Sequence, residues 1–475
     1  MSRVAWDGNF EFLGAPIGSA EYCGAFTSER VAQAKVTLDA VAKLTDPQVG
    51  LRLLRHCAGF CKMVYSMRVT DPEAHSAALL AFDELQRATF TEITGLRPND
   101  AQWGQAQRGF THSGLGLRSV ARHAPGAYLA SCAATQAQCL AADAGFVCDV
   151  DTPQSAPARA LVALNGMLPG GSPVTMENMA KLRQKDISTM IDKVAHEDFF
   201  NSASVSDRAT LLSESLPGAS GFLSAAPSKE FGLAMEPSEF VTEVARRLLM
   251  PVFPADRFCP FCDCVLDRKG GHALTCSCAG DRVARHNSTR NLVGRFAQAA
   301  GLNPTLERPH LLPPRPDDPY GANLRRPADV YLPAWDNGAP AAFDLAITSP
   351  QRQDVLAQAA NTVGSAAASY EITKIQHLNT AAECQRQGVL FVPVVAETSG
   401  GWGLSGMQVL RRIAKSTAHL TGQDPDLVLG QHLQVLCVAI RSANARAVLR
   451  RGCEPEGVGG NAQAAAASVL EAFRS

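Results

Sequence analysis

The sequence predicts a protein of mixed α and α/β class, with a helical N-terminal domain, a small cysteine-rich module and a C-terminal region of strands and helices. The first 148 residues carry apolar side chains at helical spacing, five cysteines crowd between Cys259 and Cys278, and two strand patterns meet at Asn337-Gly338. A chain of 475 residues is long enough for about three domains.

The charge distribution restricts how the chain could bind a polyanion. Lys and Arg total 44 and Asp and Glu total 45, so the net charge of −1 excludes nucleic-acid binding through bulk positive charge alone. Between Arg257 and Arg326, however, eleven basic and six acidic residues give a local charge of +5. We interpret this segment as a phosphate-facing surface, with an ordinary solvated surface as the alternative.

Two other classes of protein are excluded by the sequence pattern. No apolar run approaches the length of a membrane span, and the first residues lack the apolar core of a secretory signal. The segment Gly114–Arg118 (GLGLR) lacks the GxGxxG spacing and follows no strand pattern, so no dinucleotide cofactor is expected. We therefore expect a soluble intracellular protein without a membrane partner.

Composition divides the chain into five regions. Residues 1–148 form a helical domain, with helices expected over Val31–Leu44 and Pro47–Val69, and residues 149–253 form a connector rich in Ser, Pro and Gly. Short helices are expected in this connector near Glu177–Val194 and Ser238–Leu249. The remaining regions are the cysteine-rich module (254–280), the domain that contains the strands (281–440), and a helical or disordered tail (441–475).

Four side chains in the cysteine-rich module are spaced as zinc ligands: Cys259, Cys262, His272 and Cys276. Two, nine and three residues separate them in turn, so two thiolates on a tight turn can meet an imidazole and a third thiolate from the next loop. Few apolar side chains lie here to hold the segment folded, which favours a structural zinc ion. Cys264 and Cys278 are competing ligands, and unligated thiols in a loop are the alternative.

Two aspartates are predicted to share one face of a hairpin. The Asn337-Gly338 pair favours a two-residue turn. In that register the opposed pairs are Asp336 with Ala339, Tyr331 with Asp344, and Asp329 with Ala346. Because side chains alternate along a strand, Asp329 and Asp344 become diagonal neighbours on one face, about 7 to 8 Å apart at the backbone. Pro333 and Pro340 could shift this register.

These carboxylates predict a magnesium site. Two like charges on an otherwise apolar hairpin repel unless a proton or a divalent cation lies between them, and hard oxygen ligands suit Mg²⁺, which also binds water and substrate phosphate. Glu307 is a candidate for a third oxygen ligand if its segment joins the sheet, with simple exposure as the alternative. A water held by such an ion is the natural nucleophile in phosphodiester hydrolysis.

Lys374 is the candidate charge partner for that reaction. It is the only lysine between Lys269 and Lys415, and it lies in a helical pattern that follows the hairpin. Tyr370, one helical turn earlier, shares its face and is suited to align it. Without the two aspartates, a solvated side chain would be the better interpretation.

A basic stripe is predicted on the helix after the cysteine-rich module. The candidates for contact with nucleic-acid phosphates are Arg282, Arg285, His286 and Arg290. Three of them recur every four residues, and Val293 and Ala300 continue the same side, so the stripe changes from basic to apolar along the helix. A capping or packing histidine is the alternative for His286.

Seven motifs follow one another in the C-terminal half and together carry a resemblance to a known family: CPFC, GGHALTC, ARHN, RPADV, FDLAITSP, YEITK and LFVPVVAETSGGWG. The region that holds them, Pro254–Leu420, resembles the zinc knuckle and restriction-like endonuclease domain at the C-terminal end of non-LTR retrotransposon polyproteins. The resemblance implies a PD-(D/E)XK restriction-endonuclease-like fold, with a mixed sheet flanked by helices, and metal-dependent nicking of the DNA target that primes reverse transcription. It also implies a nuclear protein whose partners are DNA and, as a second candidate, the retroelement RNA.

The resemblance assigns roles to three of the residues above. Asp329, in RPAD where the family often has PD, matches the first aspartate of the motif, and Asp344 matches its second acidic residue. The lysine of the motif usually follows two positions later, where this chain has Ala346. In the retrotransposon branch it is displaced to a following helix, a position that Lys374 fits.

The first 148 residues resemble the thumb region of a reverse transcriptase. FEFLGAPIG is similar to the strand beyond the palm, while LRLLRHC and WGQAQRGFTHSGLGLRS are similar to thumb segments. An aromatic-x-Asp-Asp palm motif is missing, since the sole Asp-Asp pair, Asp317-Asp318, lies among prolines. The resemblance therefore implies the C-terminal part of a retroelement protein, which does not polymerise by itself.

The leading hypothesis is an Mg²⁺-dependent DNA endonuclease with a structural zinc module. Two rivals belong to other classes: a catalytically inactive nucleic-acid-binding remnant that keeps the zinc site, and a protein-interaction scaffold that keeps only the zinc staple.

Overall fold

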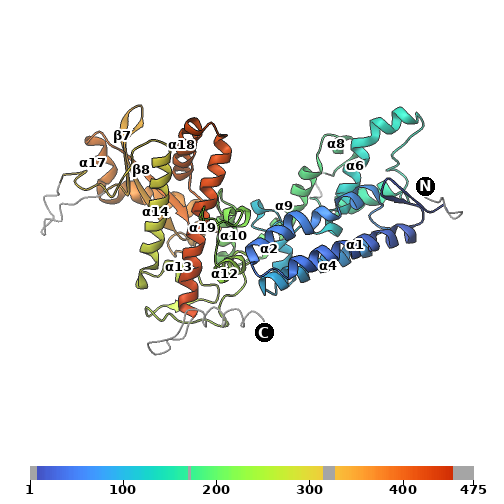
Figure 1. Ribbon diagram of the computed structural model, residues 1–475, viewed down its shortest axis with the longest axis horizontal. Helices are drawn as coiled ribbons and strands as arrows, with labels where there is room; N and C mark the ends of the chain where they lie inside the picture. The colour runs from blue at the N-terminus through green and yellow to red at the C-terminus, as the bar shows by residue number, and fades with distance from the viewer. Residues whose placement is uncertain (1–7, 170–172, 314–326, 453–475) are drawn as a thin grey trace. The chain divides into compact units, whose positions relative to one another are not determined.

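The computed structural model describes residues 8–169, 173–313 and 327–452, and the chain divides into two compact units at Ser202. The described residues are mostly helical with a small mixed sheet, in agreement with the mixed α and α/β class (Figure 1). Asp317-Asp318 and the predicted tail beyond Gly452 lie outside the described residues.

The first unit is helical apart from one short hairpin. Its principal elements are β1 (Phe10–Phe12), β2 (Ala15–Ile17), α1 (Ala20–Ala42), α2 (Pro47–Leu53), α3 (Val64–Val69), α4 (Ser76–Thr94), α5 (Asp100–Ala106), α6 (Val120–Ala142), α7 (Ala156–Gly166), α8 (Met176–Met179) and α9 (Gln184–Ser202). α1 packs along α4, and α6 packs on α3 and α7. The predicted continuous helix over Pro47–Val69 is wrong, because a π-helical turn after α2 ends at Gly59, where the backbone leaves the helical region (φ −90°, ψ −130°).

The second unit holds the strands that were expected after residue 254. Its principal elements are α10 (Val205–Glu214), α11 (Gly221–Ser224), α12 (Pro237–Arg247), β3 (Arg257–Phe258), β4 (Val265–Leu266), α13 (Gly271–Thr275), α14 (Asp281–Ala299), β5 (Thr305–Leu306), β6 (Val330–Asp336), β7 (Ala339–Thr348), α15 (Leu356–Ala359), α16 (Ser365–Gln376), α17 (Thr380–Arg386), β8 (Leu390–Glu397), α18 (Leu404–Thr421) and α19 (Pro425–Gly452). The segment 149–253, expected as a connector, carries α7 to α12, and the boundary between the units falls inside it.

The main sheet of the second unit has the strand order β5-β6-β7-β8. β6 pairs antiparallel with β5 and β7, whereas β7 and β8 are parallel. A parallel pair needs a long crossover, which the stretch α15 to α17 supplies. One face of the sheet packs against α14, α18 and α19 around Phe343 and Leu410, and α16 packs on the other face through Ala367.

The predicted hairpin register is correct at the turn and wrong beyond it. Asp336 faces Ala339, but Leu332 faces Ala341 and Val330 faces Phe343, because three residues of β6 oppose Pro340 alone. The two prolines of this stretch, Pro333 and Pro340, lack the N–H groups that a regular ladder needs, so the strand bulges there. The shift of two residues is even, so each side chain keeps its predicted face.

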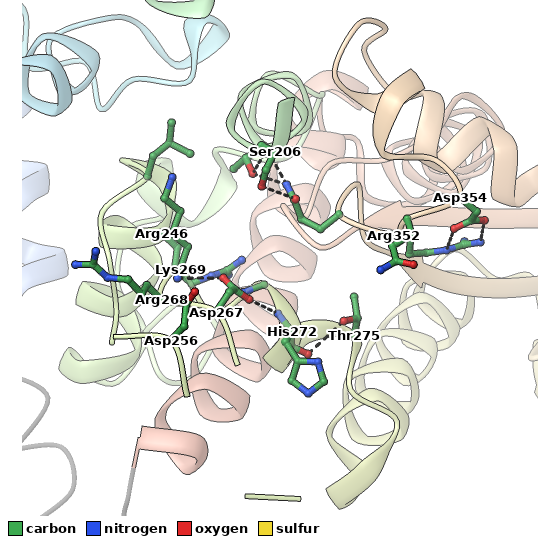
Figure 2. Close-up of a pocket in the computed structure, with 15 residues that line it drawn as sticks. Ser206, Arg246, Asp256, Asp267, Arg268, Lys269, His272, Thr275, Arg352 and Asp354 are labelled. Carbon is green, nitrogen blue, oxygen red and sulfur yellow. Dashed lines mark hydrogen bonds and ion pairs between the residues drawn. The ribbon is translucent and has the colours of Figure 1, made fainter. Parts of the chain in front are cut away.

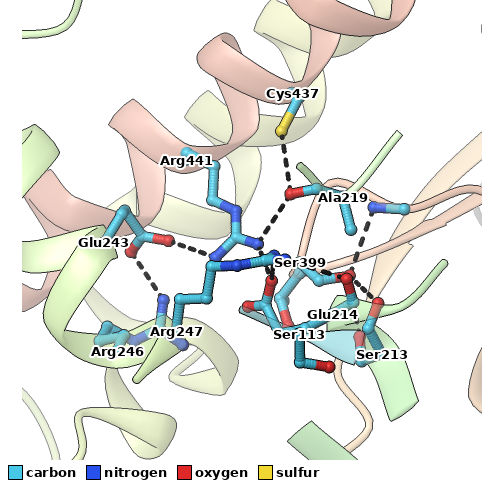
Figure 3. A network of polar contacts seen from close by, with 12 residues as sticks. Ser113, Ser213, Glu214, Ala219, Glu243, Arg246, Arg247, Ser399, Cys437 and Arg441 are labelled. Atoms are coloured by element: carbon cyan, nitrogen blue, oxygen red, sulfur yellow. Dashed lines mark hydrogen bonds and ion pairs between the residues drawn. The ribbon is translucent and has the colours of Figure 1, made fainter. Parts of the chain in front are cut away.

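Four buried charges join α10, α12 and α19 (Figure 3). Arg441 donates to Glu214 at 2.5 Å and to Glu243 at 3.0 Å, and Arg247 donates to Glu214 at 2.5 Å. Their side chains are at most 4% exposed. Burial raises the pKa of Glu214, but the positive charges of Arg441 and Arg247 outweigh this and hold its pKa below the usual value. Glu214 is therefore ionised in the core between two guanidinium groups.

Replacing Arg441 with Met should lower the free energy of unfolding by about 3 to 5 kcal/mol, because two buried carboxylates lose a shared cation. Urea unfolding of the full chain measures this loss. Arg412→Met is the matched control, since the Arg412–Asp336 pair is about half exposed (43% and 53%) and such pairs contribute less than about 1 kcal/mol. Equal losses in the two variants would contradict the role given to the buried charges.

Candidate metal centre and acidic site

The cysteine-rich module is a small hairpin followed by one turn of helix. β3 and β4 pair antiparallel, and the Cys259 N–H donates to the Cys264 carbonyl at 2.9 Å to close the turn that carries Cys262. The Asp267 carboxylate accepts hydrogen bonds from the backbone N–H groups of Lys269, Gly271 and His272, which holds the loop before α13. Local backbone hydrogen bonds thus orient the cysteine turn and the histidine helix.

The structure brings the four predicted zinc ligands together. The ligand atoms of Cys259, Cys262, His272 and Cys276 all lie within 4.8 Å of one another. His272 Nε2 lies 3.2 Å from Cys262 Sγ, which in turn lies 3.7 Å from Cys276 Sγ. Three thiolates and one imidazole at this spacing fit the tetrahedral shell of a structural zinc ion, so the cluster could bind zinc. Neither competing thiol, Cys264 or Cys278, belongs to the cluster.

Arg451 of α19 connects the zinc cluster to the rest of the second unit. It donates to Asp281 at 2.7 Å and to the Cys278 carbonyl at 3.5 Å, and its guanidinium lies near the thiols of Cys276 and Cys259. Burial opposes ionisation of Cys259, but hydrogen bonds from Phe261 N–H, His272 and Arg451 lower its pKa to about 6. Cys259 is therefore prepared to ionise at neutral pH. A backbone hydrogen bond at Cys264 acts to lower the pKa of Cys262, but burial and the neighbouring thiols raise it to about 12.

Asp329 and Asp344 meet on the sheet, as the sequence predicted. Asp329 immediately precedes β6, and its N–H donates to the Phe343 carbonyl at 2.8 Å, which places it beside the part of β7 that carries Asp344. Asp329 also accepts a hydrogen bond from the Leu345 N–H at 2.7 Å, and the two carboxylates are close enough to share a hydrogen bond. They are 18% and 21% exposed, so the site is recessed but open to solvent.

Different partners shift the pKa values of the two carboxyl groups in opposite directions. Burial raises the pKa of Asp344 to about 6, and the neighbouring charge of Asp329 adds to this, while Lys374 opposes it. Burial acts in the same direction on Asp329, but the hydrogen bond and charge of His286 and the Leu345 N–H leave its pKa below the usual value. Like charges this close oppose each other's ionisation, so Asp344 loses its proton only as the pH rises through about 6.

Lys374 lies where the sequence predicted a charge partner. Its ammonium group on α16 donates to Asp344 Oδ1 at 2.8 Å and lies 5.9 Å from the ring centre of Tyr370. Burial alone would lower the pKa of Lys374, but Asp344 and Asp329 keep it above the usual value. Lys374 is therefore a cation at neutral pH and is suited to stabilise negative charge, not to accept a proton.

A cavity of about 360 Å³ adjoins the two aspartates. His286 and Lys374, which each contact one aspartate, line it together with Arg282, Tyr370 and Ser277. A ligand in this cavity would thus meet two positively charged or protonatable groups beside the carboxylates. The geometry offers a place for a phosphate group next to a cation held by oxygen ligands.

Glu307 joins the sheet edge but pairs with an arginine. It directly follows β5, and its N–H donates to the Asp329 carbonyl at 3.0 Å. Its carboxylate is 42% exposed and forms an ion pair with Arg290 of α14. The segment of Glu307 therefore joins the sheet, which was the condition for a third oxygen ligand. Its carboxylate, however, is neutralised by Arg290, a residue of the predicted basic stripe.

The predicted basic stripe separates into four different environments. Arg282 is exposed, His286 donates to or accepts from Asp329 Oδ1 at 3.1 Å, and Arg290 pairs with Glu307. Arg285 is 3% exposed, and its guanidinium donates to Asn444 and to the Leu274 carbonyl. Arg285 thus joins α14 to α19 and the zinc module, and it also lines the cavity beside the acidic site, so its contact with phosphates stays a prediction.

Sequence reasoning missed the contact between His286 and Asp329. The two residues lie 43 positions apart, and no local spacing relates a helix to a strand end across that distance. The four-residue spacing placed His286 correctly on the face of α14 that leads to the site, but it could not distinguish a phosphate contact from a carboxylate contact.

Comparison with protein-family models and with curated proteins gives no match for this chain. Among the described residues, no helix combines the length and apolarity that crossing a bilayer requires.

The purified protein should contain about one zinc ion per chain, as measured by metal analysis. Cys259→Ser should lose most of this zinc and destabilise the second unit, because the module has few apolar contacts of its own. Cys264→Ser is the matched control and should retain zinc, since Cys264 is exposed and outside the cluster. Zinc loss in both variants, or in neither, would contradict the ligand set.

The raised pKa of Asp344 predicts a pH-dependent stability without added magnesium. Its pKa of about 6 in the folded state exceeds the value of about 3.9 expected in the unfolded chain, so the carboxyl stabilises the fold below about pH 4 and this contribution is lost as pH rises through 6. Asp344→Asn should therefore match the wild type near pH 4 and exceed it by at most roughly 2 to 3 kcal/mol above pH 7. Urea unfolding at several pH values measures the difference, with the exposed Asp336→Asn as a control that should show no such trend.

Proposed function

We propose that this protein is a retroelement-derived, Mg²⁺-dependent DNA endonuclease that nicks its target. The observation that carries the proposal is the meeting of Asp329, Asp344 and Lys374 at one recessed, solvent-accessible point on a mixed sheet flanked by helices. The PD-(D/E)XK type of nuclease requires that arrangement of two acids and one lysine.

Each residue would have a distinct part in hydrolysis. Asp329 and Asp344 would hold Mg²⁺, which would supply a bound water of lowered pKa and neutralise charge on the scissile phosphate. Lys374, protonated at neutral pH, would stabilise the negative charge that develops at phosphorus. His286 would orient Asp329 through its hydrogen bond. Glu307 would contribute only after its ion pair with Arg290 opened.

The zinc module and the first unit complete the proposal. The Cys259 to Cys276 module would be structural, because all four ligand positions come from protein, and with Arg282 it would orient the DNA beside the acidic site. The first unit would correspond to a reverse transcriptase thumb, retroelement RNA would be a second partner, and the protein would act in the nucleus. Without a palm motif in this chain, no polymerase activity is proposed.

A second candidate function is nucleic-acid binding without cleavage. The ion pair between Lys374 and Asp344 favours it, because that pair already occupies one carboxylate oxygen and partly balances the charge that would attract Mg²⁺. Steeply salt-dependent DNA binding with no nicking in the wild type would support this candidate and would also count against a purely protein-binding scaffold.

Nicking of supercoiled plasmid DNA in the presence of Mg²⁺ tests the proposal. Asp344→Ala and Asp329→Ala should each reduce the nicking rate by at least about a hundredfold, since metal-held charge stabilisation is lost, and Lys374→Met should reduce the rate by a similar factor. Asp336→Asn, on the same hairpin but at its exposed turn, is the control and should retain the wild-type rate. Wild-type activity that survives Asp344→Ala would defeat the assignment.

A further inference from the structure

A second cavity, of about 760 Å³, lies beside the zinc cluster in the second unit. Figure 2 shows Arg246, Arg268 and Lys269 on one side of it and Arg352 with Asp354 on the other. Its volume lies within the range of pockets that enclose a drug-sized ligand, about 300 to 1,000 Å³. It is therefore large enough for a short stretch of one extended polymer strand and too small to enclose a double helix.

Residues that line this cavity are neighbours of residues that line the cavity of the acidic site at two points. Thr275 lines the first and Ser277 lines the second, with only the zinc ligand Cys276 between them. The Arg352 guanidinium lies 5.0 Å from the ring centre of Tyr370, which lines the acidic-site cavity together with Lys374. Arg352 therefore lines the larger cavity and lies next to a residue of the acidic-site cavity.

The acidic side chains of the larger cavity are mostly occupied by backbone donors. Asp267 accepts three backbone N–H groups, and Asp256 accepts the Arg268 N–H at 2.7 Å. Arg268 is exposed, and no side-chain partner is found for its guanidinium in the part of the chain that the structure describes. Arg268 is thus free to meet a ligand, whereas Lys269 pairs with Asp207 and Arg246 pairs with Glu243.

The pairing of Arg352 is of a kind that a phosphate can replace. It donates to Asp354, whose side chain is 60% exposed, and to the Thr348 hydroxyl at 3.1 Å. An exposed ion pair contributes little to stability, whereas a guanidinium binds a phosphate through two parallel hydrogen bonds. An incoming phosphodiester could therefore displace Asp354 at little cost.

We propose that the two cavities form one track for a single strand of nucleic acid. The strand would pass from the carboxylates over Tyr370 to Arg352, and then along Arg268 and Lys269 beside the zinc module. This inference rests on the proposed function and adds to it the strandedness and path of the bound substrate. The recognised chemistry is the phosphodiester backbone, which both DNA and RNA supply, and contact through phosphates makes the binding salt-dependent.

Fluorescence anisotropy with the zinc-loaded full chain, without added magnesium, tests the track. The probes are labelled 20-nucleotide single-stranded DNA, single-stranded RNA and duplex DNA. Each probe is titrated at several salt concentrations with the wild type, with Arg268→Glu, with Arg352→Glu and with the control Arg411→Glu. Arg411 is exposed on α18 and lines neither cavity. Each track variant should weaken single-strand binding by about tenfold and reduce the slope of log affinity against log salt by about 0.7, with duplex binding changed less. Zinc content and circular dichroism check that the variants fold.

Each outcome has a definite meaning. If the track variants lose affinity for both single-stranded DNA and single-stranded RNA, the track is supported and the shared phosphodiester backbone is the recognised group. If the loss of affinity is confined to DNA or to RNA, the track is supported and that nucleic acid is its ligand. Unchanged single-strand binding in Arg268→Glu, an equal loss in Arg411→Glu, or a larger loss with duplex DNA overturns it. Failure of the endonuclease is distinguishable, because it appears as absent nicking while the track variants still lose single-strand binding.

Discussion

A buried set of opposed charges, in which Arg441 of α19 meets charges on α10 and α12, is the constraint on which the second unit depends. Removing Glu214, Glu243, Arg247 and Arg441 from water is favourable only if every charge finds a partner in good geometry, so α10, α12 and α19 can meet in few ways. Further along the same helix, Asn444 holds the loop after β8 and Arg451 holds the zinc module. One helix thus positions the metal cluster and the sheet relative to each other.

The acidic site shows the opposite use of charge. Two carboxylates share one recess although burial and mutual repulsion raise the pKa of Asp344 to about 6. Lys374 and His286 offset the repulsion only in part, each from a different helix. The repulsion between these two carboxylates disfavours their ionisation, and a bound cation would remove it. This is the physical basis for proposing Mg²⁺ at the site.

The features that the sequence predicted correctly depend on short spacing. The four zinc ligands lie within eighteen residues, so turn geometry alone brings them together, and Asn337-Gly338 specified the turn between β6 and β7. The register failed two residues from the turn, where prolines interrupt the ladder, but the shift is even and keeps the side chains of β6 on their predicted faces. The predicted meeting of Asp329 and Asp344 was therefore not lost. Lys374 was found by its rarity and its helical position, not by any contact visible in the sequence.

By itself the sequence determined the residue types, the local turns and the helical faces: three thiols and an imidazole at zinc spacing, two aspartates on one hairpin face, and one lysine on the following helix. Only the tertiary structure decided that His286 meets Asp329, that Arg285 is buried against Asn444, and that Glu307 pairs with Arg290. These contacts join segments between 17 and 159 residues apart. Local propensity contains no information on such distances, because they are set by how whole helices pack on the sheet and around the buried charges of α19.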